Sequence, residues 1–223
     1  MELFLDTGNI QEIKELNSIL PIDGVTTNPT LIAKENKRIF QSVKEISNII
    51  GEDKIIHVQV VSSDFEGMME EARFLNKLHK NIFVKIPVTK EGFRAVKELS
   101  KEGIKVTATA IFTAHQGVLA AKAGASYVAP YVNRLDNISG DGINVVKDLL
   151  TIFKEYNSNC KVLGASFKNA QQVLEIFKHG IQSVTVPADV AKSLMNHPLT
   201  DYSVDKFVSD WEEVFGEGTK IIE

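Results

Sequence analysis

Disulfide bonds and metal centres built from cysteine are excluded by the composition of this chain. Its 223 residues include a single cysteine, Cys160, which has no partner for an internal disulfide. The five histidines are scattered and lack a metal-ligand spacing such as H-E-x-x-H. We therefore expect no metal ion and no cofactor.

A strong charge of one sign and long apolar runs are also missing. The formal net charge is −4 at pH 7, which argues against a nucleic-acid partner. No apolar run approaches the roughly 18 residues of a membrane helix. Residues 1–6 lack the basic and apolar regions of a secretion signal. We expect a cytoplasmic chain that binds neither nucleic acid nor membranes.

The chain does contain a regular alternation of strand-like and helix-like segments. Hydrophobic residues make up 43% of it, which is enough for a large core. Strand-like runs occur at residues 3–6, 24–29, 54–61, 81–88, 104–111, 126–131, 160–166 and 183–186. Segments with the helical spacing of apolar residues separate these runs, and no linker-like segment interrupts them. The pattern predicts an α/β fold, a (β/α)8 TIM barrel that forms a single domain over residues 1–223.

An open, doubly wound sheet is the alternative fold. Such a sheet usually carries a glycine-rich phosphate loop after its first strand. Residues 6–9, Asp-Thr-Gly-Asn, match that loop poorly. The barrel is therefore favoured.

The most unusual strand-like segment is residues 81–88, where Lys85 interrupts an apolar run. Burial removes hydration from a lysine, so its pKa falls and its amine becomes nucleophilic near neutral pH. A lysine that forms a Schiff base with a carbonyl needs this preparation. The alternative is a lysine whose ammonium group reaches solvent from the end of the strand.

Polar residues stand at the carboxyl ends of most of the predicted strands, where a barrel places its catalytic groups. They are Asp6, Thr26, Asn28, Gln59, Lys85, Thr109, Tyr131 with Arg134, and Ser166. Side chains alternate along a strand, so Phe83 shares a face with Lys85. By the same rule His57 shares a face with Gln59, and we expect a packed core imidazole there. If these faces point inward, the polar groups share one cavity.

Five short motifs can be compared with known families. They are Leu5-Asp6-Thr7, Gly24-Val25-Thr26-Thr27-Asn28-Pro29, Val84-Lys85-Ile86-Pro87, Ala129-Pro130-Tyr131-Val132-Asn133-Arg134 and Ala165-Ser166-Phe167-Lys168. Together, and along essentially the whole chain, they resemble the transaldolase family, and more narrowly its small branch, which contains fructose-6-phosphate aldolase. The resemblance implies that Lys85 forms the Schiff base.

We expect the other polar residues to assist catalysis at Lys85 or to bind the substrate. The predicted catalytic residues are Lys85, Tyr131, Asp6, Gln59 and Thr109, with Tyr131 moving protons through a water that Gln59 and Thr109 hold. The predicted substrate-binding residues are Asn28, Thr26, Arg134 and Ser166, the last two for phosphate and Thr26 as support for Asn28 or the water. Two alternatives stay open: Asp6 could cap the first helix, and Arg134 could pair with Asp136 or Asp141.

Two residues bear on the type of reaction. Within the family that this chain resembles, transaldolases typically carry glutamate and phenylalanine at these positions. This chain is similar to the aldolase in having Gln59 and Tyr131. A phenol can exchange a proton with a nascent hydroxyl group, whereas phenylalanine cannot. We therefore expect a lyase that reversibly cleaves fructose 6-phosphate to dihydroxyacetone and glyceraldehyde 3-phosphate. The alternatives are a transaldolase that transfers a dihydroxyacetone unit between sugar phosphates, and a silent sugar-phosphate-binding barrel.

An amphipathic segment at residues 200–216 follows the predicted barrel. Its apolar residues are Val204, Phe207, Val208, Trp211 and Phe215. This additional C-terminal helix could pack on its own barrel. The resemblance implies instead that it docks on a neighbouring subunit of a homo-oligomer, a decamer or a pentamer.

Overall fold

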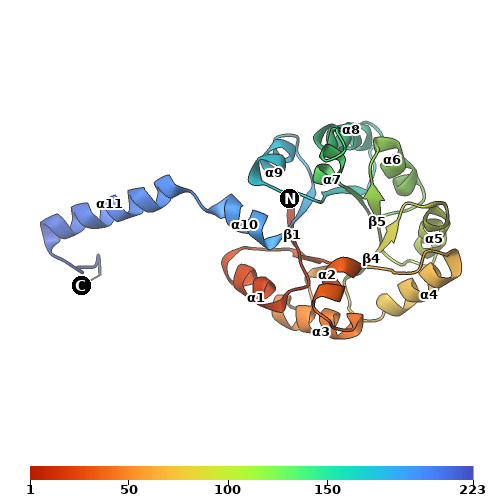
Figure 1. The fold of residues 1–223 in the computed structure, drawn as a ribbon, viewed down its shortest axis with the longest axis horizontal. Helices are drawn as coiled ribbons and strands as arrows, with labels where there is room; N and C mark the ends of the chain where they lie inside the picture. The colour runs from red at the N-terminus through yellow and green to blue at the C-terminus, as the bar shows by residue number, and fades with distance from the viewer. Residues whose placement is uncertain (223) are drawn as a thin grey trace.

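A computed structural model describes residues 1–222, in which eight parallel strands close into a barrel in sequence order (Figure 1). The strands are β1 (Glu2–Asp6), β2 (Gly24–Thr26), β3 (Ile55–Gln59), β4 (Ile82–Pro87), β5 (Val106–Ile111), β6 (Tyr127–Pro130), β7 (Lys161–Gly164) and β8 (Ser183–Val186). The last strand pairs with the first, Leu5 opposite Val186. The predicted (β/α)8 fold is confirmed.

Helices surround the barrel in Figure 1, and the last helix of the chain extends away from it. They are α1 (Ile10–Ile19), α2 (Pro29–Lys34), α3 (Ile39–Ile50), α4 (Phe65–Leu75), α5 (Lys90–Lys101), α6 (Ala114–Lys122), α7 (Val132–Asp136), α8 (Gly142–Glu155), α9 (Ala170–Phe177), α10 (Ala188–Met195) and α11 (Pro198–Phe215). None of the helices in residues 1–222 is both long and apolar enough to cross a bilayer.

Short polar side chains start the barrel helices at the carboxyl ends of the strands. Thr89 accepts a hydrogen bond from the main-chain N–H of Gly92, and Asp64 accepts one from Gly67, as N-cap residues do. The buried side of α5 then carries Val96 and Leu99. Such caps begin several of the helices that run back along the outside of the barrel.

The two faces of the strands have different partners. Outward side chains such as Leu5 and Val84 are fully buried under the helices. Inward side chains fill the barrel interior, where Phe4, Phe83 and Tyr127 form a separate cluster. This cluster fills part of the barrel interior, and polar side chains such as Asp6 and Lys85 follow it toward the carboxyl ends of the strands.

Two local features depart from the predicted pattern. The short helix α7 directly follows β6, where the sequence pattern predicts no helix. Strand β5 has an irregularity between Ala108 and Ile111, and Ala110 lies there in the left-handed region with φ of 57°. Such a bulge redirects a strand end, and bulges are frequent beside active sites.

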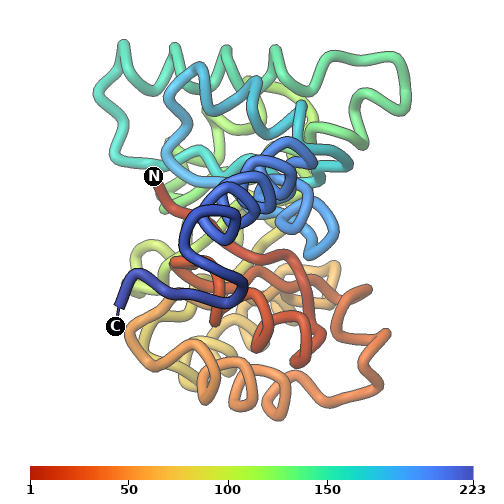
Figure 2. Tube along the Cα trace, turned by 90° about the vertical axis from the view of Figure 1, so that its left-hand side faces the viewer, coloured from red at the N-terminus to blue at the C-terminus, as the bar shows by residue number. Residues whose placement is uncertain are grey.

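Helix α11 extends away from the barrel in Figure 1, and in Figure 2, which is viewed from that side, it lies in front of the barrel. It begins at Pro198, two residues before the predicted start, and none of its residues is buried. Large apolar side chains such as Phe207 and Val214 are about 70% exposed. The interpretation in which this helix packs on its own barrel is therefore wrong.

Candidate active site

A cavity of about 380 Å³ opens at the carboxyl ends of the strands. Seven of the predicted site residues line it: Asp6, Asn28, Lys85, Thr109, Tyr131, Arg134 and Ser166. They come from six strands or the segments that directly follow them. The closed barrel thus brings together side chains that lie up to 160 positions apart in the sequence.

Lys85 lies in the carboxyl-terminal half of β4, lines the cavity and is only 6% exposed. Its ammonium group donates a hydrogen bond of 2.7 Å to the main-chain carbonyl of Thr27. Burial lowers the pKa of Lys85; the Asp6 carboxylate opposes this shift, and the Arg134 guanidinium adds to it. The alternative of a solvent-reaching lysine is excluded, and the amine has the environment of a nucleophile.

Tyr131 supplies a phenol to the same cavity. Its hydroxyl lies 3.1 Å from the Thr109 hydroxyl, and either can be the donor. The Arg134 guanidinium carbon lies 4.5 Å from the centre of the Tyr131 ring. Because Tyr131 is the N-cap residue of α7 and Arg134 lies in that helix, the unpredicted helix is what holds this pair together.

Asp6 is tied to the barrel wall by a chain of hydroxyl groups. Thr26 donates to the Asp6 carboxylate over 2.7 Å, and its oxygen lies 2.6 Å from the Thr185 hydroxyl. The single proton of Thr26 is committed to Asp6, so Thr185 is the donor to Thr26. The hydrogen bonds of Thr26 thus join Asp6 and Thr185 and do not involve Asn28. The partners of Thr26 lie across the barrel, where strand alternation cannot identify them.

The alternative role for Asp6 as a helix cap is excluded, because Asn9 caps α1. Asn28 caps α2, and its Oδ1 accepts a hydrogen bond of 3.0 Å from the main-chain N–H of Leu31. This use of Oδ1 leaves the amide NH2 of Asn28 as the group that can donate to a ligand in the cavity.

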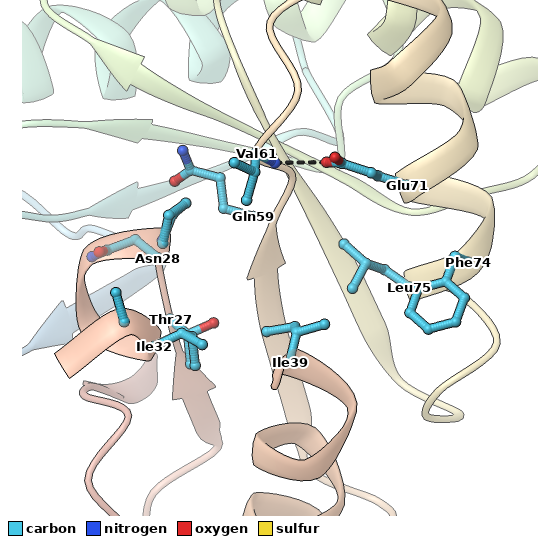
Figure 3. Close-up of a pocket in the computed structure, with 11 residues that line it drawn as sticks. Thr27, Asn28, Ile32, Ile39, Gln59, Val61, Glu71, Phe74 and Leu75 are labelled. Carbon is cyan, nitrogen blue, oxygen red and sulfur yellow. Dashed lines mark hydrogen bonds between the residues drawn. The ribbon is translucent and has the colours of Figure 1, made fainter. Parts of the chain in front are cut away.

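Gln59 lies in a neighbouring pocket of about 330 Å³ rather than in the main cavity (Figure 3). Asn28 lines both spaces. The Oε1 of Gln59 is buried and has no hydrogen-bond partner among the described residues. Thr109 contacts Tyr131 in the main cavity, so Gln59 and Thr109 line different spaces.

Glu71 on α4 holds the segment that follows β3 in place (Figure 3). The Glu71 carboxylate accepts hydrogen bonds from the main-chain N–H groups of Val61 and Ser62, at 2.6 Å and 3.1 Å. Glu71 therefore anchors the segment that follows Gln59. The sequence offered no signal for this role, because a glutamate on the outer part of a helix is ordinary.

Arg134 has no ion-pair partner among residues 1–222. The proposed partners are used elsewhere: Asp136 accepts hydrogen bonds from Gly142 and Gln172, and Asp141 caps α8. Ser166 lies in the left-handed region, with φ of 61°, and its carbonyl accepts a hydrogen bond from Asn133. Arg134 and Ser166 thus lie free at the cavity wall, where an anion could bind.

Ten further residues line the cavity without being among the predicted site residues, and they include Lys34, Phe167, Lys168 and Thr185. Thr185 could have been found, because it alternates with Ser183 on β8 and stands near that strand's carboxyl end. Lys34 could not, since it lies six residues beyond Asn28 at the end of α2.

The expectations for the scattered histidines and the cysteine can also be compared with the structure. Within the described part of the chain, no group of three or more histidine, cysteine, aspartate or glutamate residues could hold a metal ion. Burial raises the pKa of the Cys160 thiol to about 12, so this cysteine is a poor nucleophile. His57 is fully buried in the core, as expected.

Comparison with known proteins adds independent evidence. Residues 3–220 match the family model described as transaldolase/fructose-6-phosphate aldolase. A probable transaldolase of Thermoanaerobacter sp. (strain X514) is 49% identical over 96% of this chain and 98% of its own length. A probable transaldolase of Methanococcus maripaludis is also 49% identical, over 95% and 98% of the two chains. The chain belongs to the transaldolase/fructose-6-phosphate aldolase family.

Proposed function

We propose that this enzyme is a Schiff-base aldolase that reversibly cleaves fructose 6-phosphate to dihydroxyacetone and glyceraldehyde 3-phosphate. The observation that carries the proposal is the buried Lys85 amine in one cavity with the hydrogen-bonded hydroxyls of Tyr131 and Thr109. A carbonyl substrate in this cavity meets both a nucleophile and a group that can move protons.

The first steps form the imine. The neutral amine of Lys85 attacks C2 of the ketose to give a carbinolamine, which loses its hydroxyl group and a proton as water. The proton that leaves with the hydroxyl group is delivered through water in the cavity and does not come from the nitrogen. The resulting iminium therefore keeps one N–H, which can still donate to the Thr27 carbonyl. The positive nitrogen then accepts the electron pair of the C3–C4 bond.

Bond cleavage needs a base at the C4 hydroxyl. Loss of that proton turns C4 into the aldehyde of glyceraldehyde 3-phosphate and leaves an enamine on Lys85. Asp6, which Thr26 holds in place, contacts this hydroxyl in our proposal, and Tyr131 exchanges the protons through water. Protonation of the enamine at C3 and hydrolysis of the iminium then release dihydroxyacetone.

The two ends of the substrate have different partners in this proposal. The Asn28 amide binds hydroxyl groups of the three-carbon donor. Arg134, Ser166 and Lys168 receive the phosphate, because a guanidinium fork and a hydroxyl match its oxygens.

A transaldolase is the second candidate, and it is favoured by the two relatives, which are both named probable transaldolases. Both reactions share the steps up to the enamine, which then reacts with a proton in the aldolase or with a second aldose in the transaldolase. Fructose 6-phosphate supplied alone and together with erythrose 4-phosphate separates them. Free dihydroxyacetone without acceptor supports the aldolase, whereas product that forms only with acceptor contradicts it.

We also propose that the chain forms a homo-oligomer in which α11 docks on a neighbouring subunit. The support is the exposed apolar surface of this helix, together with its position apart from its own barrel (Figure 1). A helix with this much exposed apolar surface marks an interaction site.

A further inference from the structure

The barrel interior contains a pair of polar side chains that has no part in the proposed reaction. His57 on β3 and Thr107 on β5 are both fully buried, and the His57 Nδ1 lies 2.8 Å from the Thr107 hydroxyl oxygen. The rest of this layer is aromatic, with the rings of Phe4, Phe83 and Tyr127 centred about 5 Å from the imidazole. Apolar side chains of the same shape would pack here with equal or greater stability. The presence of a polar pair therefore calls for a reason other than stability.

The strand order shows where this hydrogen bond runs. β4 lies between β3 and β5, so a bond from His57 to Thr107 crosses the inner face of β4. In the strand register His57 is opposite Phe83, and Thr107 is opposite Lys85. The bond therefore passes diagonally between the two inward side chains of β4, with Phe83 stacked on the imidazole and Lys85 on the cavity side.

The protonation of the imidazole follows from the partners that are present. If the Thr107 hydroxyl donates to Nδ1, only the Nε2–H is left without a conventional partner. In the tautomer that carries its proton on Nδ1, the Thr107 proton and the Nε2 lone pair would both lack a hydrogen-bond partner among the described residues. We assign the Nε2–H form, in which Phe4 and Tyr127, nearly perpendicular to the imidazole, offer ring faces as weak acceptors.

A charge on this imidazole is strongly disfavoured. Burial is the main cause that holds the pKa of His57 well below its usual range, and the nearby Lys85 adds to it. His57 therefore stays neutral in the range where an enzyme of this kind works. An acid–base role is excluded for it, whereas a fixed, neutral hydrogen bond is compatible with the positions of both residues.

We propose that His57 and Thr107 are positioning residues for Lys85. Their hydrogen bond forms a rigid support below the lysine side chain and keeps its amine at the Thr27 carbonyl and the cavity. Without it the flexible side chain of Lys85 gains freedom to move toward the barrel interior. The proposal rests on the function of Lys85 as the imine-forming residue.

Two matched variants of Thr107 test this idea. Thr107→Val keeps the shape of the side chain but removes the hydroxyl, and Thr107→Ser keeps the hydroxyl. The measurement is the rate at which borohydride traps dihydroxyacetone on Lys85, followed by mass spectrometry and normalised to folded protein. We expect trapping to be at least about 10-fold slower in Thr107→Val, since small displacements of a reacting group cost this much or more. Thr107→Ser should restore most of the rate.

The double variant His57→Phe with Thr107→Val separates positioning from packing. It replaces both polar partners with apolar groups of similar shape, a change that is commonly neutral or stabilising. We expect its melting temperature to equal or exceed that of the parent, while the trapping rate stays at least about 10-fold lower. A support needed only for folding would show the opposite behaviour.

The remaining outcomes are also decisive. If dihydroxyacetone is trapped in Thr107→Val at the same rate as in the parent, the inference is overturned and the proposed function remains intact. Failure of Thr107→Val to fold while Thr107→Ser folds would overturn it too, because the pair would then be structural. No adduct in the parent protein would instead contradict the proposed function itself.

Discussion

The ammonium group of Lys85 and the main-chain carbonyl of Thr27 are joined by a hydrogen bond of 2.7 Å. A carbonyl acceptor favours the charged lysine, whereas burial of the side chain favours the neutral amine. Burial prevails, since the pKa of Lys85 is lowered. The bond therefore orients the amine without preventing its deprotonation, and Asp6 and Arg134 adjust the balance from opposite directions.

The pH dependence of imine formation should reveal this balance. The neutral amine is the nucleophile, so the trapping rate should rise with pH through a midpoint below the ordinary lysine value of 10.5. Arg134→Gln removes a charge that lowers the pKa of Lys85 and should move the midpoint up. Asp6→Asn removes a charge that raises it and should move the midpoint down. Shifts of the same sign in both variants would contradict the electrostatic account.

Tyr131 and Thr109 should act after the imine has formed. Tyr131→Phe keeps the ring beneath Arg134 but removes the proton-transfer group, so cleavage of fructose 6-phosphate should slow by about 100-fold. Trapping of dihydroxyacetone on Lys85 should continue at close to the parental rate. Thr109→Val removes the partner of the phenol and should cause a smaller loss in the same step. Equal loss of trapping and cleavage in Tyr131→Phe would place the phenol in imine formation instead.

The balance between cleavage and transfer should depend on two side chains. Gln59→Glu combined with Tyr131→Phe introduces the residues that the family resemblance implies for transaldolases. We expect less free dihydroxyacetone and relatively more transfer to erythrose 4-phosphate, because protonation of the enamine then loses its phenol. The ratio of the two products, measured by chromatography, checks this prediction. An unchanged ratio would show that other residues decide the outcome.

The assembly should depend on the apolar surface of α11. Phe207→Asp places a charge in that surface and should reduce the particle mass measured by light scattering, because a buried unpaired carboxylate is costly. Ser209→Asp adds the same charge to the same helix and is the control. If both variants keep the parental mass, or if the parent is itself monomeric, the helix does not mediate assembly.

The fold and much of the candidate site could be predicted from local patterns. Eight strand-like runs separated by helical spacing predict a barrel, since each strand needs a helix to cover its outer face. The two-residue period predicts that Lys85 shares a strand face with Phe83, because residues two apart point to the same side of a strand. The rule that a barrel gathers function at its carboxyl ends then pointed to the cavity.

What could not be predicted depends on contacts between distant strands. The partner of Thr26 is Thr185, 159 positions away, and no local pattern connects them. Gln59 shares a face with His57, yet its amide lies in a neighbouring pocket, because a long side chain has torsions that strand alternation does not fix. Helix α7 is only five residues long and is too short for a helical period to be recognised.

The central claim is that the buried amine of Lys85 condenses with a ketone. It is tested most directly by incubating the enzyme with dihydroxyacetone, reducing with borohydride and locating the adduct by peptide mass spectrometry. The account predicts one adduct, on the peptide that contains Lys85, and its complete loss in Lys85→Ala. No adduct in the parent, or an adduct that persists on another lysine in Lys85→Ala, would contradict it.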